Sequence, residues 1–76
     1  MQYIYYIYPV NYNRIKISRI EKGLSQQELA DLVGVTRQTI GLIEKNKYNP
    51  TLNLCIGIAT ALGKTLNDLF WNENKI

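Results

Sequence analysis

The chain has 76 residues, a single cysteine and no histidine, with nine Lys and Arg against six Asp and Glu. This composition excludes an internal disulfide and an ordinary zinc site, two means by which very small domains gain stability. The net charge of +3 is compatible with nucleic acid but does not by itself indicate it. No apolar run approaches the roughly 20 residues of a membrane-spanning helix. We expect one small cytoplasmic domain that could bury more surface by dimerising.

The first part of the chain differs from the rest in composition. Its sequence, MQYIYYIYPV, is rich in tyrosine and isoleucine and lacks the basic start and cleavage site of a signal peptide. Aromatic and β-branched residues favour a strand, and Pro9 suggests where it stops. We interpret residues 1–12 as a leader, which is either a short strand or an added extension.

Helix signals follow at close intervals from residue 13. Asn13 can cap a first helix that runs to about Lys22. Ser25 stands three residues before Glu28, which is the spacing of a capping box and predicts the start of a second helix. Gly34 is suited to end that helix, because glycine readily takes the left-handed conformation found there.

The connection to the third helix is unusually short. Thr36 is a candidate cap for a helix running to about Lys45, and only Gly34 and Val35 separate this cap from the second helix. A break of this length makes two touching helices cross steeply, which is the geometry of a helix-turn-helix.

Two further helices complete the pattern. Thr51 caps a fourth helix that ends at Gly63, and Thr65 starts a short fifth helix that runs through Phe70. The sequence therefore predicts an all-α domain of five helices over residues 13–70. A tail of six residues follows this domain.

Residues suited to catalysis are sparse. Histidine, the commonest general acid or base, is absent, the carboxylates are scattered, and no Gly-rich phosphate loop occurs. Cys55 lies between apolar neighbours at helical spacing, which is typical of a small core residue. We expect no enzymatic activity, no cofactor, no metal and no small-molecule ligand.

The third helix has a polar side that a core does not need. Ile40 and Ile43 account for its inward side, which leaves Arg37 and Gln38 on the outer side near its N-terminal end. Arg and Gln can make bidentate hydrogen bonds to guanine and adenine in the major groove. Both also occur on ordinary solvated helices, so composition alone favours the solvated surface.

The chain resembles a known family over about residues 13–70. The run SQQELADLVGVTRQTIGLIEKNKYNPTLNLCIGIATALGKTLNDLF is similar to the Cro/phage-repressor, or XRE, type of helix-turn-helix regulator, in its compact single-domain form. The resemblance implies a five-helix lambda-repressor-like domain that binds double-stranded DNA. The matching positions, in order and without gaps, are Gln26, Leu29–Ala30, Gly34–Val35, Ile40, Ile43–Glu44, Asn49–Pro50, Ile58–Ala59, Leu62–Gly63 and Leu69–Phe70.

The resemblance also assigns roles to two groups of residues on the DNA side. Base contacts specify a sequence, whereas phosphate contacts supply affinity without sequence information. The residues expected at base edges are Thr36, Arg37, Gln38, Gly41 and Leu42. Those expected at backbone phosphates are Gln26, Thr39, Lys45, Asn46, Lys47 and Tyr48. A solvated loop is the alternative for Lys45 and Lys47, and part-burial against the domain is the alternative for Leu42.

Two features of the third helix concern its support. Arg19 and Glu44 match a pair that bridges the first and third helices in related repressors; a loose surface pair contributing less than about 1 kcal/mol is the alternative. Gly41 should cost roughly 1 kcal/mol relative to alanine within a helix. It either lets the helix approach the groove closely or is merely tolerated.

Family members that bind specifically are usually homodimers, so the resemblance implies a near-palindromic operator with half-sites about 34–36 Å apart. Some compact relatives pair N- and C-terminal strands, and Tyr3–Tyr8 and Trp71–Ile76 could form such a small antiparallel sheet. The dimer contacts expected from the C-terminal third are Leu66, Leu69, Phe70 and Trp71.

We therefore expect a homodimeric transcriptional regulator, more specifically a repressor, of bacterial or phage origin. One alternative is an antitoxin of the same fold, which would bind a toxin as well as its operator. Another is a protein-interaction module that uses the tyrosine and tryptophan side chains.

Overall fold

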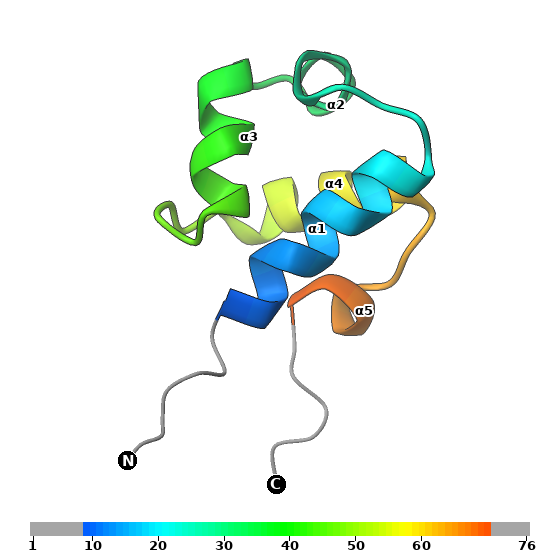
Figure 1. The fold of residues 1–76 in the computed structure, drawn as a ribbon. Helices are drawn as coiled ribbons and strands as arrows, with labels where there is room; N and C mark the ends of the chain where they lie inside the picture. The colour runs from blue at the N-terminus through cyan, green and yellow to red at the C-terminus, as the bar shows by residue number, and fades with distance from the viewer. Residues whose placement is uncertain (1–8, 71–76) are drawn as a thin grey trace, which may run out of the picture.

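The computed structural model describes residues 9–70, with side chains from residue 14 onward. α2 packs against α3 and α4, α1 packs against α3 and α5, and α4 also contacts α5 (Figure 1). The predicted all-α class is confirmed, and between residues 9 and 70 no strand occurs. Both expected terminal strands lie outside this range. The five helices are α1 (Pro9–Glu21), α2 (Gln26–Val33), α3 (Arg37–Glu44), α4 (Leu52–Leu62) and α5 (Leu66–Phe70).

The first helix begins earlier than the sequence predicted. α1 starts at Pro9, so Asn13 lies inside the helix instead of capping it. Proline is well accepted at the first helical position, because its missing N–H would have no partner there and its φ already suits a helix. Pro9 is therefore the first residue of α1, and the leader strand expected to stop there lies outside the described residues. The wider division into leader, domain and tail stays a prediction.

The connection between α2 and α3 is set by local hydrogen bonds. The predicted capping box is present: Glu28 N donates to Ser25 Oγ at 3.0 Å, and Ser25 N donates to the Glu28 carboxylate at 2.8 Å. Gly34 ends α2 with a φ of 78°, in the left-handed region. Thr36 then caps α3 by accepting a hydrogen bond from Thr39 N at 3.2 Å. These contacts keep the turn short, so α3 stays packed against α2.

α4 and α5 begin with caps of the same kind. Thr51 Oγ1 accepts from Leu54 N at 3.2 Å. Before α5, Asp68 N donates to Thr65 Oγ1 at 3.1 Å and Thr65 N donates to the Asp68 carboxylate at 3.0 Å. The backbone and side-chain hydrogen bonds from Thr65 hold the pKa of the Asp68 carboxyl below its ordinary value. The starts predicted for both helices are confirmed.

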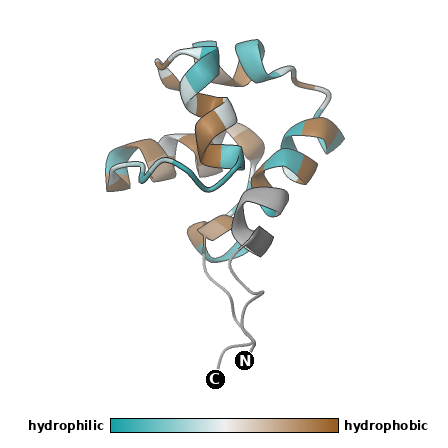
Figure 2. Ribbon diagram, turned by 60° about the vertical axis from the view of Figure 1, so that its left-hand side comes forward, coloured by the Kyte–Doolittle hydropathy of each residue, from teal (hydrophilic) through white to brown (hydrophobic). Residues whose placement is uncertain are grey.

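One apolar core receives side chains from all five helices. Hydrophobic and hydrophilic residues alternate along the helices in Figure 2, as expected when each short helix buries one side. None of the helices within residues 9–70 is long and apolar enough to span a membrane. The buried apolar residues are Ile15, Leu29, Ala30, Ile40, Ile43, Ile58, Ala59, Leu62 and Leu69.

A buried ion pair lies beside this core. Arg19 Nε donates to one oxygen of the Glu44 carboxylate at 2.7 Å, and Arg19 Nη2 donates to the other at 3.3 Å. Arg19 Nη1 donates to the Leu24 carbonyl at 2.8 Å, and Gln26 Nε2 donates to Glu44 at 3.0 Å. The two charged side chains are only 9% and 3% exposed. The predicted bridge between α1 and α3 is confirmed, and its burial excludes the loose surface pair.

Removing one member of this pair should destabilise the domain strongly. Arg19→Met would leave the buried Glu44 carboxylate with Gln26 as its remaining side-chain donor, and stranding a buried charge costs about 3–5 kcal/mol. Arg19→Met/Glu44→Met should recover much of that loss, because both charges are gone. Urea unfolding followed by circular dichroism measures the free energy of unfolding of the wild-type protein and of each variant. If the double variant lost as much stability as the separate Arg19→Met and Glu44→Met variants combined, the two residues would not be coupled.

Two glycines of the helix-turn-helix should respond in opposite directions to alanine. A Cβ on Gly41 would lie 3.8 Å from Gln26 Nε2, an ordinary contact, so Gly41→Ala should stabilise the domain by up to about 1 kcal/mol. Gly34 has room for a Cβ but a φ of 78°, so Gly34→Ala should destabilise it by about 1–2 kcal/mol through backbone strain. The same unfolding experiment compares them. Similar losses in both variants would contradict this account.

Candidate nucleic-acid interface

The N-terminal end of α3 presents polar side chains to solvent. Arg37 and Gln38 are the first two residues of the helix, and both are exposed. Thr36 is exposed as well, and its hydroxyl lies 3.0 Å from that of Thr39. The first turn of α3 contains no acidic residue, so the partial positive charge of the helix end is not neutralised there. This end of α3 therefore favours an anionic partner.

A hollow of about 430 Å³ lies between α2 and α3. It brings together four of the five predicted base-contact residues with two of the six predicted phosphate-contact residues. Thr36 is the base-contact candidate that does not line it. The residues lining the hollow are Gln26, Arg37, Gln38, Gly41, Leu42 and Lys45.

The charges on this side of the domain are mostly positive. Arg37, Lys45 and Lys47 are exposed, and none of them forms an ion pair with any residue of the described part. Glu44 is the acidic residue of α3, and its carboxylate is buried and paired with Arg19. A polyanion would therefore meet unpaired cations here without an exposed carboxylate on α3 to repel it.

The other predicted phosphate-contact residues lie outside the hollow. Thr39 is half-buried, and Asn46, Lys47 and Tyr48 are exposed in the segment that follows α3. Asn46 has a φ of 60°, and Lys47 N donates to the Leu42 carbonyl at 2.8 Å, which closes the end of the helix. The structure brings these residues to the C-terminal end of α3, beyond the side chains that line the hollow.

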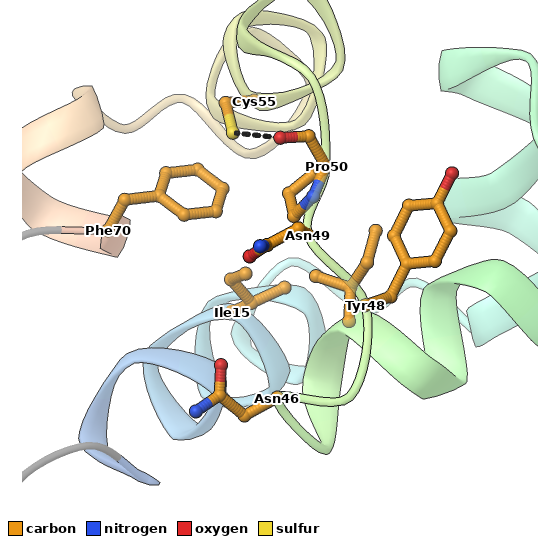
Figure 3. Close-up of a pocket in the computed structure, with 8 residues that line it drawn as sticks. Ile15, Asn46, Tyr48, Asn49, Pro50, Cys55 and Phe70 are labelled. Carbon is orange, nitrogen blue, oxygen red and sulfur yellow. Dashed lines mark hydrogen bonds between the residues drawn. The ribbon is translucent and has the colours of Figure 1, made fainter.

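Asn46 and Tyr48 belong to the rim of a second hollow, of about 240 Å³ (Figure 3). Cys55 also lines it, half-buried, with Sγ 4.0 Å from the Pro50 carbonyl. Burial raises the pKa of the Cys55 thiol, so the thiol stays protonated near neutral pH. The cysteine lies at the margin of the core instead of inside it, and no residue between 14 and 70 forms an interaction that would activate its thiol as a nucleophile.

A separate apolar surface covers part of α4 and α5. Leu52 is 64% exposed and Ile56 is 45% exposed, and both lie one turn apart on α4. Leu66 and Phe70 of α5 are half-buried, and both line an apolar hollow with Leu52. We call these four residues the α4–α5 face. From the sequence, no role was assigned to Leu52 or Ile56.

The predicted dimer contacts are distributed unevenly in the structure. Leu66 and Phe70 belong to the α4–α5 face, but Leu69 is completely buried in the core. Its side chain therefore presents no surface to a second protomer. Trp71 lies outside the described residues.

Comparison with known proteins agrees with this geometry. A family model for the helix-turn-helix domain matches residues 15–69. The chain therefore belongs to the XRE-type helix-turn-helix family of DNA-binding transcriptional regulators, which is not a family of enzymes. The resemblance inferred from the sequence is confirmed.

Particular relatives share most of this chain. A Bacillus subtilis protein, the uncharacterised HTH-type transcriptional regulator YgzD, is 43% identical over 63 residues, which are 83% of this chain and 96% of that protein. The immunity repressor of Bacillus phage phi105 is 35% identical over 83% of this chain and 44% of its own length. The crystal structure of the restriction-modification controller protein C.AhdI from Aeromonas hydrophila matches with a TM-score of 0.74 and 36% identity, over 82% of this chain and 96% of that one.

Proposed function

We propose that this protein is a sequence-specific transcriptional repressor that binds operator DNA with α3 in the major groove. The observation that carries the proposal is the exposure of Arg37 and Gln38 at the start of α3, beside a hollow and unpaired cations. Side chains at the N-terminal end of a projecting helix can reach base edges while the rest of the domain rests on the backbone.

The residues divide by their chemistry into two kinds of contact. Arg37 offers paired donors to the O6 and N7 of guanine, and the Gln38 amide offers a donor and an acceptor to adenine. Lys45 and Lys47 carry charges without a defined hydrogen-bonding edge, which suits backbone phosphates. This division predicts that losing a base contact and losing a phosphate contact will have different effects on DNA binding.

The threonine pair at the helix start can add a contact of its own. The hydroxyls of Thr36 and Thr39 share one hydrogen bond, and Thr36 also accepts from Thr39 N. Two hydroxyl protons are available and only one is used between them. The second can donate to a phosphate oxygen as the strand passes the helix end.

Repression is the regulatory outcome that the relatives favour. The phage phi105 protein, which is 35% identical over most of this chain, is named an immunity repressor. A domain of this size on an operator acts by occupying DNA that another protein would otherwise use. The proposal therefore requires tight and sequence-dependent binding.

We place a two-fold dimer contact at the α4–α5 face. Leu52 and Ile56 expose apolar side chains beside the half-buried Leu66 and Phe70, and self-association would remove this surface from water. The face belongs to elements other than α2 and α3, so two protomers could meet there while each α3 stays free. Two half-sites about 34–36 Å apart then give a near-palindromic operator.

Replacing one residue of each contact class tests the reading role of α3. Once selection from random DNA has defined the operator, Arg37→Ala should weaken binding by about 1–3 kcal/mol and relax the preference at one base pair. Lys47→Ala should weaken operator and unrelated DNA alike and reduce the salt dependence by about one phosphate contact. Fluorescence anisotropy at several salt concentrations measures both effects. Unchanged operator preference in Arg37→Ala would refute base reading by this residue.

The dimer contact is tested with two equally exposed leucines. Leu52→Glu places a charge in the α4–α5 face and should shift the protein to monomer, because burying an unpaired carboxylate opposes association. Leu32→Glu on α2 is the matched control, since Leu32 is 63% exposed and Leu52 is 64% exposed. Sedimentation equilibrium gives the mass of each variant. A dimer that survives Leu52→Glu, or is lost equally in Leu32→Glu, would place the contact elsewhere.

A further inference from the structure

The amide of Gln26 is oriented by a residue far from it in the sequence. Gln26 Nε2 donates to Glu44 Oε1 at 3.0 Å. A carboxylate only accepts hydrogen bonds, so the NH₂ group of the amide must face Glu44 and its carbonyl oxygen must face elsewhere. Glu44 is itself fixed by two hydrogen bonds from Arg19. The Gln26 side chain is therefore held in one orientation before any ligand arrives.

Gly41 leaves room on α3 for this side chain. A Cβ built on Gly41 would lie 3.8 Å from Gln26 Nε2, so the amide passes beside the helix where residue 41 has no side chain. Any side chain longer than alanine at position 41 would extend into the space beside that amide. Gln26, although it belongs to α2, thus occupies a place on the face of α3.

Gln26 also faces the hollow between α2 and α3. It lines this hollow together with Arg37 and Gln38, whereas Glu44, to which it donates, does not. One N–H of the amide is used by Glu44, which leaves one N–H donor and the carbonyl acceptor. A neighbouring donor and acceptor are what an amide uses to bind the N7 and N6 positions of adenine in the major groove.

We propose that Gln26 is a specificity-determining residue that reads one A·T base pair, in the place left by the missing side chain of Gly41. Glu44 orients the amide, and Gly41 gives it access to the groove beside Arg37 and Gln38. This inference rests on the proposed function, because it requires operator DNA in the hollow. It differs from the phosphate role expected from the sequence, in which Gln26 would contribute no base preference.

The test compares the base preferences of Gln26→Met with those of the wild-type protein. Methionine keeps the length of the side chain but removes its donor and acceptor. Selection from random DNA should show that Gln26→Met loses the preference for adenine at one position, distinct from the position relaxed by Arg37→Ala. Affinity for the wild-type operator should fall about 5- to 150-fold, the range for one lost bidentate base contact, with little change on unrelated DNA.

Gln27→Met is the matched control, since Gln27 is the next residue of α2, donates to the Asp31 carboxylate and does not line the hollow. It should keep the wild-type preference at every position. An equal loss of affinity for operator and unrelated DNA in Gln26→Met would identify a phosphate contact and overturn the inference. An unchanged preference would overturn it as well. If the wild-type protein selected no sequence at all, the proposed function itself would fail.

Discussion

The orientation of α3 depends on the buried ion pair between Arg19 and Glu44. The pair joins the first and third helices across 25 positions of sequence, through hydrogen bonds of 2.7 and 3.3 Å. Arg19 also binds the Leu24 carbonyl, and Glu44 also accepts from Gln26, so the same group of contacts secures the loop before α2 and the start of α2. A charge pair shielded from water holds its partners firmly, because neither side chain can leave without stranding the other.

This arrangement explains the electrostatic character of the interface. The carboxylate of α3 is turned inward and compensated, while Arg37, Lys45 and Lys47 stay exposed and form no ion pair within residues 9–70. The proposed DNA-binding surface is therefore positive, although the whole chain carries a net charge of only +3. The apolar α4–α5 face is built from other helices, so the proposed DNA contacts and the proposed dimer contact need not compete for the same residues.

Local features were predictable because they depend on residues about one turn apart. The Ser25 capping box and the caps at Thr36 and Thr51 were read correctly, since each joins a side chain to a backbone N–H three residues away. The start of α1 was placed at Asn13 instead of Pro9, because asparagine is a common helix cap, although proline is also well accepted at the first helical position. Leu69 was placed at an interface because α5 has only five residues, too few for periodicity to separate its inner from its outer side.

The sequence by itself determined the five helices, the short turn before α3 and the polar residues that begin it. Helix propensity, caps and turns are short-range effects, so the order of residues is enough to define them. Only the tertiary structure decided that the amide of Gln26 lies beside Gly41, that Glu44 is buried, and which leucines remain exposed. Those outcomes depend on how helices that are distant in the sequence pack together, and this packing cannot be predicted from local sequence patterns.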